Sequence, residues 1–148
     1  MTAAQGRFAA VAVATLAIDL STKAWASAQL DRPIQIAGSL SLRLHHNPGV
    51  AFGLGRSLPS GILLTVTAAL CLALVWAGWT GALHPPVAVG LVLGGAVGNL
   101  LDRLTGGSVV DMIYLTWWPT FNLADVAICS GLVLLLLASL RAPAAEST

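Results

Sequence analysis

Charged residues are scarce in this chain of 148 residues. Lysine, arginine, aspartate and glutamate together make up 9% of it, whereas hydrophobic residues make up 57%. Soluble domains carry about 25% charged residues, so this chain has too little polar surface to face water on every side. The shortage argues against an ordinary soluble domain and predicts an integral membrane protein. A net charge of only +1 also argues against a nucleic-acid partner, which needs a strongly basic surface.

Cysteine is rarer still, and no metal-binding motif is present. Cys71 and Cys129 both lie inside apolar runs, so we expect each to be a small, buried hydrophobic side chain. The sequence contains no C-x-x-C and no H-E-x-x-H, and the adjacent His45 and His46 would point to opposite faces of a strand. We therefore expect neither a metal nor another cofactor.

Long apolar runs are the main feature that the sequence does have. Four of them approach the length of about 20 residues that a membrane-spanning helix needs, and none shows the alternation of a membrane strand. We expect spanning helices at about residues 8–28, 58–79, 86–104 and 122–140. The predicted fold class is an all-α membrane protein in which residues 1–148 form a single domain.

Two polar loops connect the spans on one side of the membrane, at about residues 29–57 and 105–120. Alternating residues around a Gly38-Ser39 turn predict a short strand pair in the first loop, and "SVVDMIYLTWW" predicts a strand in the second. The helices should therefore carry a small β-rich section outside the membrane. A count of arginines under the positive-inside rule would place these loops in the cytoplasm.

Most of the few acids lie in or beside the spans, where an ionisable group is by default a functional hypothesis. Asp19 and Lys23 are four residues apart, which places them on one helix face and close enough to pair. Asn99 and Asp102 share a face of the third span. For Asp19 and Lys23 the favoured interpretation is a neutralised structural pair, whereas for Asn99 and Asp102 a polar helix end and a site role are equally well supported.

Glycines recur every four residues in the third span, at Gly90, Gly94 and Gly98. A face of such small residues lets a second helix approach closely. The pattern predicts a helix-packing surface.

Asp111 and Asp125 carry the chemical prediction. Taken alone, Asp111 is a loop acid, and Asp125 is a first-turn acid behind an Asn122 N-cap. The residues between the two, 112–124, return to the same membrane face and let the carboxylates converge. Close carboxylates do not both ionise easily, so one should hold a proton near neutral pH. The ionised carboxylate can then take a proton from water while the protonated one polarises a carbonyl, as in aspartic proteases.

Five motifs, in order, resemble those of lipoprotein signal peptidase (signal peptidase II), the membrane aspartic protease family of bacteria. They are "DLSTK" from Asp19, "NPGVAFG" from Asn47, "GGAVGNLLDR" from Gly94, "VVDM" from Val109 and "FNLAD" from Phe121. The resemblance runs from the first span to the fourth and so covers most of the chain.

The resemblance implies an aspartic endopeptidase of the bacterial inner membrane, without a metal, whose catalytic pair is Asp111 and Asp125. Its substrates would be diacylglyceryl-modified prolipoproteins, cut just before the lipidated cysteine. It would place both termini in the cytoplasm and the active site at the outer face, against the arginine count, and we expect a monomer in contact with membrane lipid. Supporting or substrate-contacting roles are implied for Asp19, Lys23, Asn47, Gly49, Phe52, Gly95, Asn99, Asp102, Arg103, Asn122 and Ala124.

Two other functions remain open. Asp19, Lys23 and Asp102 could form the relay of a small proton-coupled transporter, although the sequence shows no inverted repeat or pair of broken helices. The chain could also be a non-catalytic scaffold whose acids are all caps and ion pairs. Proton-driven uptake without hydrolysis would favour the transporter, whereas cleavage of a diacylated peptide that depends on both dyad aspartates would exclude both alternatives.

Overall fold

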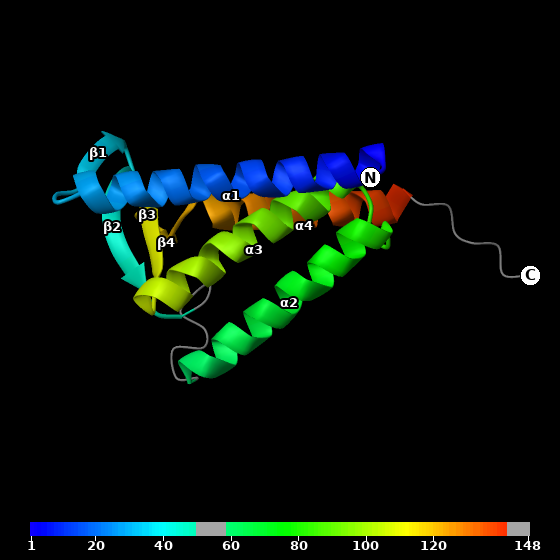
Figure 1. The fold of residues 1–148 in the computed structure, drawn as a ribbon. Helices are drawn as coiled ribbons and strands as arrows, with labels where there is room; N and C mark the ends of the chain where they lie inside the picture. Colours follow the sequence, from blue (N-terminus) through cyan, green and yellow to red (C-terminus); the bar gives the residue numbers. More distant parts are fainter. Residues whose placement is uncertain (50–58, 142–148) are drawn as a thin grey trace, which may run out of the picture.

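The computed structural model describes residues 1–49 and 59–141, which form long helices and short strands (Figure 1). The elements are α1 (Ala3–Gln29), β1 (Ile34–Ala37), β2 (Leu40–Asn47), α2 (Ser60–Thr80), α3 (Pro86–Gly106), β3 (Val109–Leu115), β4 (Trp118–Phe121) and α4 (Leu123–Arg141). The four helices are long and apolar enough to cross a membrane. They confirm the four expected spans, although α1 begins before residue 8.

The central helix is α3. In its most apolar stretch, 56% of the residues are buried inside the protein, against 11% for α4. The main core packs Val89, Val92 and Leu93 of α3 against Phe8 of α1 and Leu74 of α2. The outward faces of the other helices carry exposed leucine and valine side chains, which is the surface that lipid covers in a membrane protein.

Glycines let α1 approach α3 closely. A Cβ added to Gly90 would lie 2.8 Å from the backbone oxygen of Phe8, and one added to Gly94 would lie 2.5 Å from that of Ala12. The glycine face at every fourth residue is therefore filled by a helix of the same chain, which confirms its predicted role in packing.

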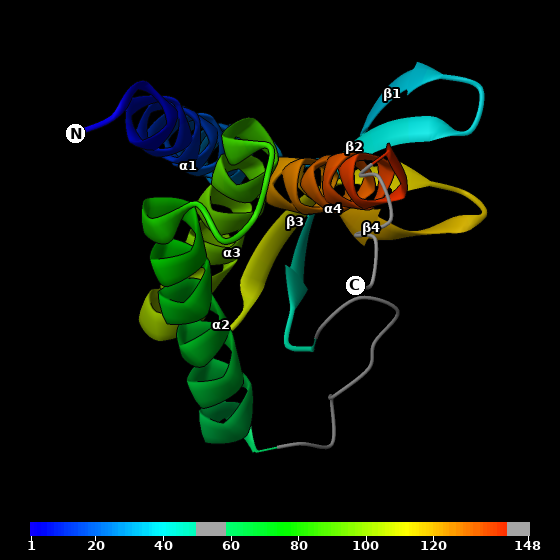
Figure 2. The same ribbon diagram turned by 90° about the vertical axis from the view of Figure 1, so that its right-hand side faces the viewer.

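The four strands form one antiparallel sheet in the order β1-β2-β3-β4. It lies at the end of the bundle opposite the N-terminus (Figures 1 and 2). The hairpin of β1 and β2 turns at Gly38, whose φ of 48° suits glycine, so the predicted strand pair is confirmed. We did not predict β4, because it contains Pro119; β4 is an edge strand, where a proline is tolerated.

The burial prediction holds for only one of the two cysteines. Cys71 is buried in the core between α2 and α3, whereas Cys129 is exposed on α4. The expectation for Cys129 was wrong because an apolar run in a membrane helix need not face protein. Most of the α4 surface is exposed on the protein, and the residue's hydrophobicity therefore suits lipid instead.

Candidate active site

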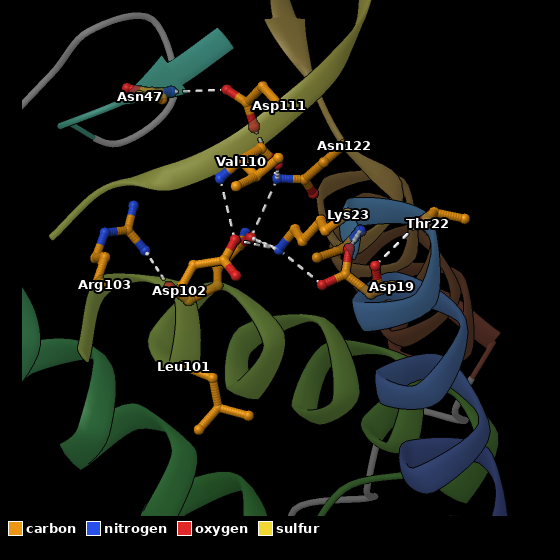
Figure 3. A network of polar contacts seen from close by, with 12 residues as sticks. Asp19, Thr22, Lys23, Asn47, Leu101, Asp102, Arg103, Val110, Asp111 and Asn122 are labelled. Atoms are coloured by element: carbon orange, nitrogen blue, oxygen red, sulfur yellow. Dashed lines mark hydrogen bonds and ion pairs between the residues drawn. The ribbon is translucent and has the colours of Figure 1, made fainter. Parts of the chain in front are cut away.

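A buried group of polar side chains joins α1 to α3, and Figure 3 shows Lys23 at its centre. The Lys23 ammonium nitrogen lies 2.7 Å from Asp19 Oδ2 and 2.9 Å from Asp102 Oδ2, and it donates a 2.8 Å hydrogen bond to Asn99 Oδ1. The ammonium group therefore contacts two carboxylates and one amide oxygen. We call Asp19, Lys23, Asn99 and Asp102 the Lys23 cluster; it confirms the pairing predicted from the spacing of Asp19 and Lys23.

The Lys23 cluster also holds the two elements that carry the dyad aspartates. The backbone N–H of Ala124, in the first turn of α4, donates to Asp19 Oδ1 over 2.9 Å. The backbone N–H of Val110, in β3, donates to Asp102 Oδ2 over 3.0 Å. The positions of β3 and α4 are thus fixed by carboxylates of α1 and α3.

Asp111 is almost completely buried on β3, with 1% of its surface exposed. The side-chain amides of Asn47 and Asn122 donate to its two oxygens over 3.1 and 2.7 Å. Burial, with a smaller contribution from the nearby Asp125, raises the pKa of Asp111 to about 6, because together they penalise the charged form more than these donors favour it. A carboxyl group with this pKa can hold a proton close to neutral pH.

Asp125 lies in the first turn of α4 and forms a reciprocal capping arrangement with Asn122. The backbone N–H of Asp125 donates to Asn122 Oδ1 over 3.0 Å, and that of Asn122 donates to Asp125 Oδ2 over 3.2 Å. This confirms Asn122 as the N-cap. The amide of Asn99 donates to Asp125 Oδ1 over 3.0 Å, so N–H groups of Asn99 and Asn122 hold both oxygens of this carboxyl group.

The fully buried Asn122 connects the two carboxyl groups. Its side-chain amide contacts Asp111 while its backbone contacts Asp125. Both aspartates line the same cavity, which has a volume of about 550 Å³. The structure therefore brings the two predicted acids together at one end of the bundle.

The cavity has two different walls. Apolar side chains of the helices form one wall, among them Leu70 of α2, Ala96 of α3 and Ile128 of α4. Side chains of β2, β3 and β4 form the other wall, including Arg43 and Tyr114. Within residues 1–49 and 59–141, no group of three or more histidine, cysteine, aspartate or glutamate side chains could hold a metal ion.

A short turn after β2 connects the dyad to Arg103. The backbone N–H of Gly49 donates to Asn47 Oδ1 over 3.0 Å, while Arg103 donates to the backbone oxygens of Gly49 and Asn99 over 2.8 and 3.2 Å. Asn47 and Arg103 also line the cavity. These hydrogen bonds connect all three residues to Asp111, whereas Phe52 lies outside the described residues.

Other residues named from the motifs lie behind the cavity wall. A Cβ added to Gly95 would lie 2.6 Å from the backbone oxygen of Ala124, so these two residues bring α3 and α4 into contact. Asp19, Lys23 and Asp102 contact one another and the backbone of neighbouring elements. We therefore interpret all five as positioning residues.

The sequence analysis missed part of the cavity wall. Arg43, His45 and Asn47 alternate along β2, and all three line the cavity. The alternation was visible in the sequence, but only Asn47 belonged to a recognised motif. Tyr114 lines the cavity as well. The sequence carried no signal for this, because Tyr114 is three residues from Asp111 and residues three apart face opposite sides of a regular strand.

The sequence comparisons with known proteins agree on one family. The family model for signal peptidase (SPase) II matches residues 11–141. The lipoprotein signal peptidase of Rhodococcus jostii is 39% identical over 142 residues, covering 88% of this chain and 70% of that protein. The one from Syntrophomonas wolfei is 44% identical over 128 residues, covering 81% and 84%. A solved bacterial membrane enzyme superimposes with a TM-score of 0.85 at 27% identity, covering 97% of this chain and 94% of its own.

Proposed function

The chain belongs to the signal peptidase II family, aspartic-type membrane peptidases that remove signal peptides from prolipoproteins, and we propose that Asp111 and Asp125 are its catalytic pair. The observation that carries the proposal is the shared contact with Asn122 at the wall of one cavity. Two carboxyl groups held in this way, one buried and one at a helix end, suit the division of labour between a general acid and a general base.

In the proposed reaction, Asp111 enters protonated and Asp125 ionised. Asp125 takes a proton from water as the water oxygen bonds to the scissile carbonyl carbon, and Asp111 gives its proton to the carbonyl oxygen. The tetrahedral diol then collapses: the C–N bond breaks, the proton on Asp125 passes to the leaving nitrogen, and a hydroxyl proton returns to Asp111. The raised pKa of Asp111 supports its assignment as the acid.

Arg103 is a candidate for binding the peptide backbone. It lines the cavity, and its Nε is buried without a hydrogen-bond partner among the described residues. An unpaired buried donor is costly, so a carbonyl oxygen of a bound peptide would satisfy it. The remaining N–H groups of Arg103 that contact Gly49 and Asn99 keep the side chain in place.

The surroundings of the cavity support a lipid-anchored substrate. The helix wall can accept acyl chains or an apolar signal segment, and the sheet wall can accept a polar peptide. We assign the cut to the bond before the lipidated cysteine and the cavity to the outer face of the inner membrane, with both termini in the cytoplasm. Because α1 fills the glycine face of α3 internally, a monomer is sufficient.

The decisive experiment uses a synthetic lipobox peptide with a diacylglyceryl cysteine. Asp111→Asn and Asp125→Asn should each lower kcat by at least about 10³-fold, while their resistance to unfolding in detergent stays close to that of the unmodified enzyme. Asp31→Asn is the matched control, because Asp31 is an exposed acid outside the spans, and it should cleave normally. Turnover within tenfold of the unmodified enzyme in either dyad variant would rule out the pair.

The same preparation separates the peptidase from its rivals. Proteoliposomes that carry the dyad variants should show neither hydrolysis nor substrate-driven proton uptake. Proton uptake that persists in both variants and disappears in Lys23→Met would favour the transporter.

The orientation of the protein in the membrane is tested by a cysteine placed at Ser39, in the β1–β2 turn. Labelling of intact cells by an impermeant maleimide is expected, and labelling only after lysis would reverse the assignment.

A further inference from the structure

The sheet wall of the cavity carries a positive charge that the cleavage chemistry does not use. Arg43 of β2 lines the cavity, and its guanidinium carbon lies 3.3 Å from the ring centroid of Tyr114. One of its N–H groups donates to Thr120 Oγ1 over 3.3 Å. In the part of the chain that the structure describes, no carboxylate lies within salt-bridge distance of Arg43. Arginine has five N–H donors, and the bond to Thr120 takes one of them, which leaves donors for a ligand.

Arg43 lies at a β-bulge in the β2–β3 ladder. Leu42 pairs with Ile113 and His45 pairs with Asp111, so two residues of β2, Arg43 and Leu44, lie opposite the single residue 112 of β3. Asp111 and Tyr114 are three residues apart and would face opposite sides of a regular strand. Bulges redirect side chains in this way, and here both residues, together with Arg43, line one cavity.

The two walls suggest how a peptide crosses the cavity. The lipid and the signal segment fit the helix wall around Leu70 and Ile128. The mature chain must leave towards water, and the sheet wall offers the polar path. Arg43 is two residues along β2 from His45, which is the cross-strand partner of Asp111. An extended peptide advances about 3.3 Å per residue, so Arg43 meets a side chain about two residues beyond the scissile bond.

We propose that Arg43 is a specificity residue that favours prolipoproteins with an acidic side chain among the first three residues after the lipidated cysteine. The inference rests on the proposed function, since it takes the cavity as the peptide site. Arginine binds carboxylates through two parallel hydrogen bonds. Stacking on Tyr114 and the hydrogen bond to Thr120 hold the guanidinium ready, which reduces the entropy lost on binding.

The test compares diacylglyceryl peptides that differ only in having Glu, Gln or Lys at the first, second or third position after the cysteine. At the best position, the unmodified enzyme should cleave the Glu peptide with a kcat/KM about tenfold above that of the Lys peptide. Arg43→Gln should reduce this ratio to less than about twofold, and Arg43→Glu should invert it. Equal kcat/KM values for the three peptides at every position would overturn the inference, although cleavage itself would remain.

Two further variants separate charge selection from a structural effect. Arg43→Lys keeps the charge and should keep the sign of the preference, with a smaller ratio because an ammonium neither stacks nor binds in bidentate fashion. Arg32→Gln removes an exposed arginine that does not line the cavity, and the ratio should stay at that of the unmodified enzyme. A loss of the preference in Arg32→Gln would show a general charge effect and overturn the assignment to Arg43.

A lipid head group is the alternative partner for Arg43. The assays are therefore run in phosphatidylcholine bilayers with and without phosphatidylglycerol. An Arg43→Gln effect that follows the lipid and not the peptide charge would overturn the inference. Binding of non-hydrolysable Glu and Lys lipopeptides is measured in parallel. If no peptide is cleaved at all, the proposed function fails, while a charge preference in affinity that requires Arg43 still supports the subsite.

Discussion

Two carboxylate pairs lie at the same end of the bundle and have opposite surroundings. In the Lys23 cluster, one ammonium contacts both Asp19 and Asp102, and neither carboxylate lines the cavity. In the dyad, amide groups hold Asp111 and Asp125, no lysine or arginine among the described residues lies within salt-bridge distance of either, and both line the cavity. Lys23 neutralises the first pair, which does not reach the cavity. Asparagine amides orient the second pair without adding a positive charge.

The difference shows what makes a buried carboxylate available for chemistry. A lysine partner would stabilise the ionised form strongly and oppose protonation. An asparagine amide orients a carboxyl group and adds no net charge. The carboxyl group can then still exchange a proton, and burial has already raised the pKa of Asp111 to about 6. Asn99 belongs to both regions, because it accepts from Lys23 and donates to Asp125.

The strongest test of this contrast removes the ammonium group that lies between Asp19 and Asp102. Lys23→Met should lower the free energy of unfolding by about 3–5 kcal/mol, because it leaves Asp19 and Asp102 buried without their counter-ion. Unfolding by SDS, followed by tryptophan fluorescence, measures the change. The triple variant Asp19→Asn, Lys23→Met, Asp102→Asn should recover at least half of the loss, since it removes the stranded charges.

A comparison with the dyad completes that test. At about pH 4, where Asp111 is protonated in the folded protein, Asp111→Asn should change the free energy of unfolding by less than about 1 kcal/mol, although it abolishes turnover at the pH of the assay. If Lys23→Met proved as stable as the unmodified protein, the Lys23 cluster would not be structural.

Asn99 tests the connection between the two regions. Asn99→Ala removes an acceptor from Lys23 and a donor from Asp125, so we expect kcat to fall about 100-fold with little change in KM. Stability should fall by about 1–3 kcal/mol, because a buried donor loses its partner. Stopped-time cleavage assays over a range of substrate concentrations separate kcat from KM. A fall in stability with normal kcat would show that Asn99 serves only the Lys23 cluster.

A smaller effect is expected where α3 approaches the same cluster. A Cβ added at Gly98 would collide with the Asp19 carboxylate, so Gly98→Ala should destabilise the protein by about 1–3 kcal/mol. Gly106→Ala is the matched control in the same helix, because nothing lies within 4 Å of its added Cβ, and it should be neutral or slightly stabilising. Thermal unfolding in detergent should rank the two variants in this order, and equal melting temperatures would contradict the close contact.

Most of the fold followed from the sequence, because four long apolar runs have few alternatives in lipid. The strand pair around Gly38 was predictable from alternation and turn chemistry. The strand β4 was not, because proline normally argues against a strand and only the edge position makes Pro119 acceptable. Helix boundaries differed by a few residues, because hydropathy alone does not define a cap.

The site was predictable only where residues formed local patterns or belonged to motifs. The spacing of Asp19 and Lys23 predicted their pairing, and the Asn122 cap was predictable from a three-residue pattern. The cavity role of Tyr114 was not, because Tyr114 is three residues from Asp111 and would face the other side of a regular strand. A bulge shifts which side chains share a face, and nothing in a single sequence marks its position.

Folding raises the pKa of Asp111, and this fixes the sign of a pH effect on stability. The protonated form is favoured in the folded state, so the contribution of Asp111 to stability is greatest below about pH 4 and is lost as pH rises through about 6. Asp111→Asn should remove this part of the pH dependence, up to about 3 kcal/mol. Unfolding curves between pH 4 and 7 measure it, and an unchanged pH dependence in the variant would contradict the raised pKa.

The finest test of the contrast changes one amide of the dyad. If Asp111 is the general acid, kcat/KM should fall as pH rises through about 6. Asn47 donates to Asp111 and favours its ionised form, so Asn47→Ala should raise the pKa of Asp111 further. The pH at which kcat/KM falls, the alkaline limb of the pH profile, should then rise by about one unit. Gln35→Ala removes an amide of the exposed β1–β2 hairpin and should leave the limb in place. A limb that stays fixed or moves to lower pH in Asn47→Ala would show that Asp111 does not supply the proton, and the roles of the two aspartates would then be exchanged.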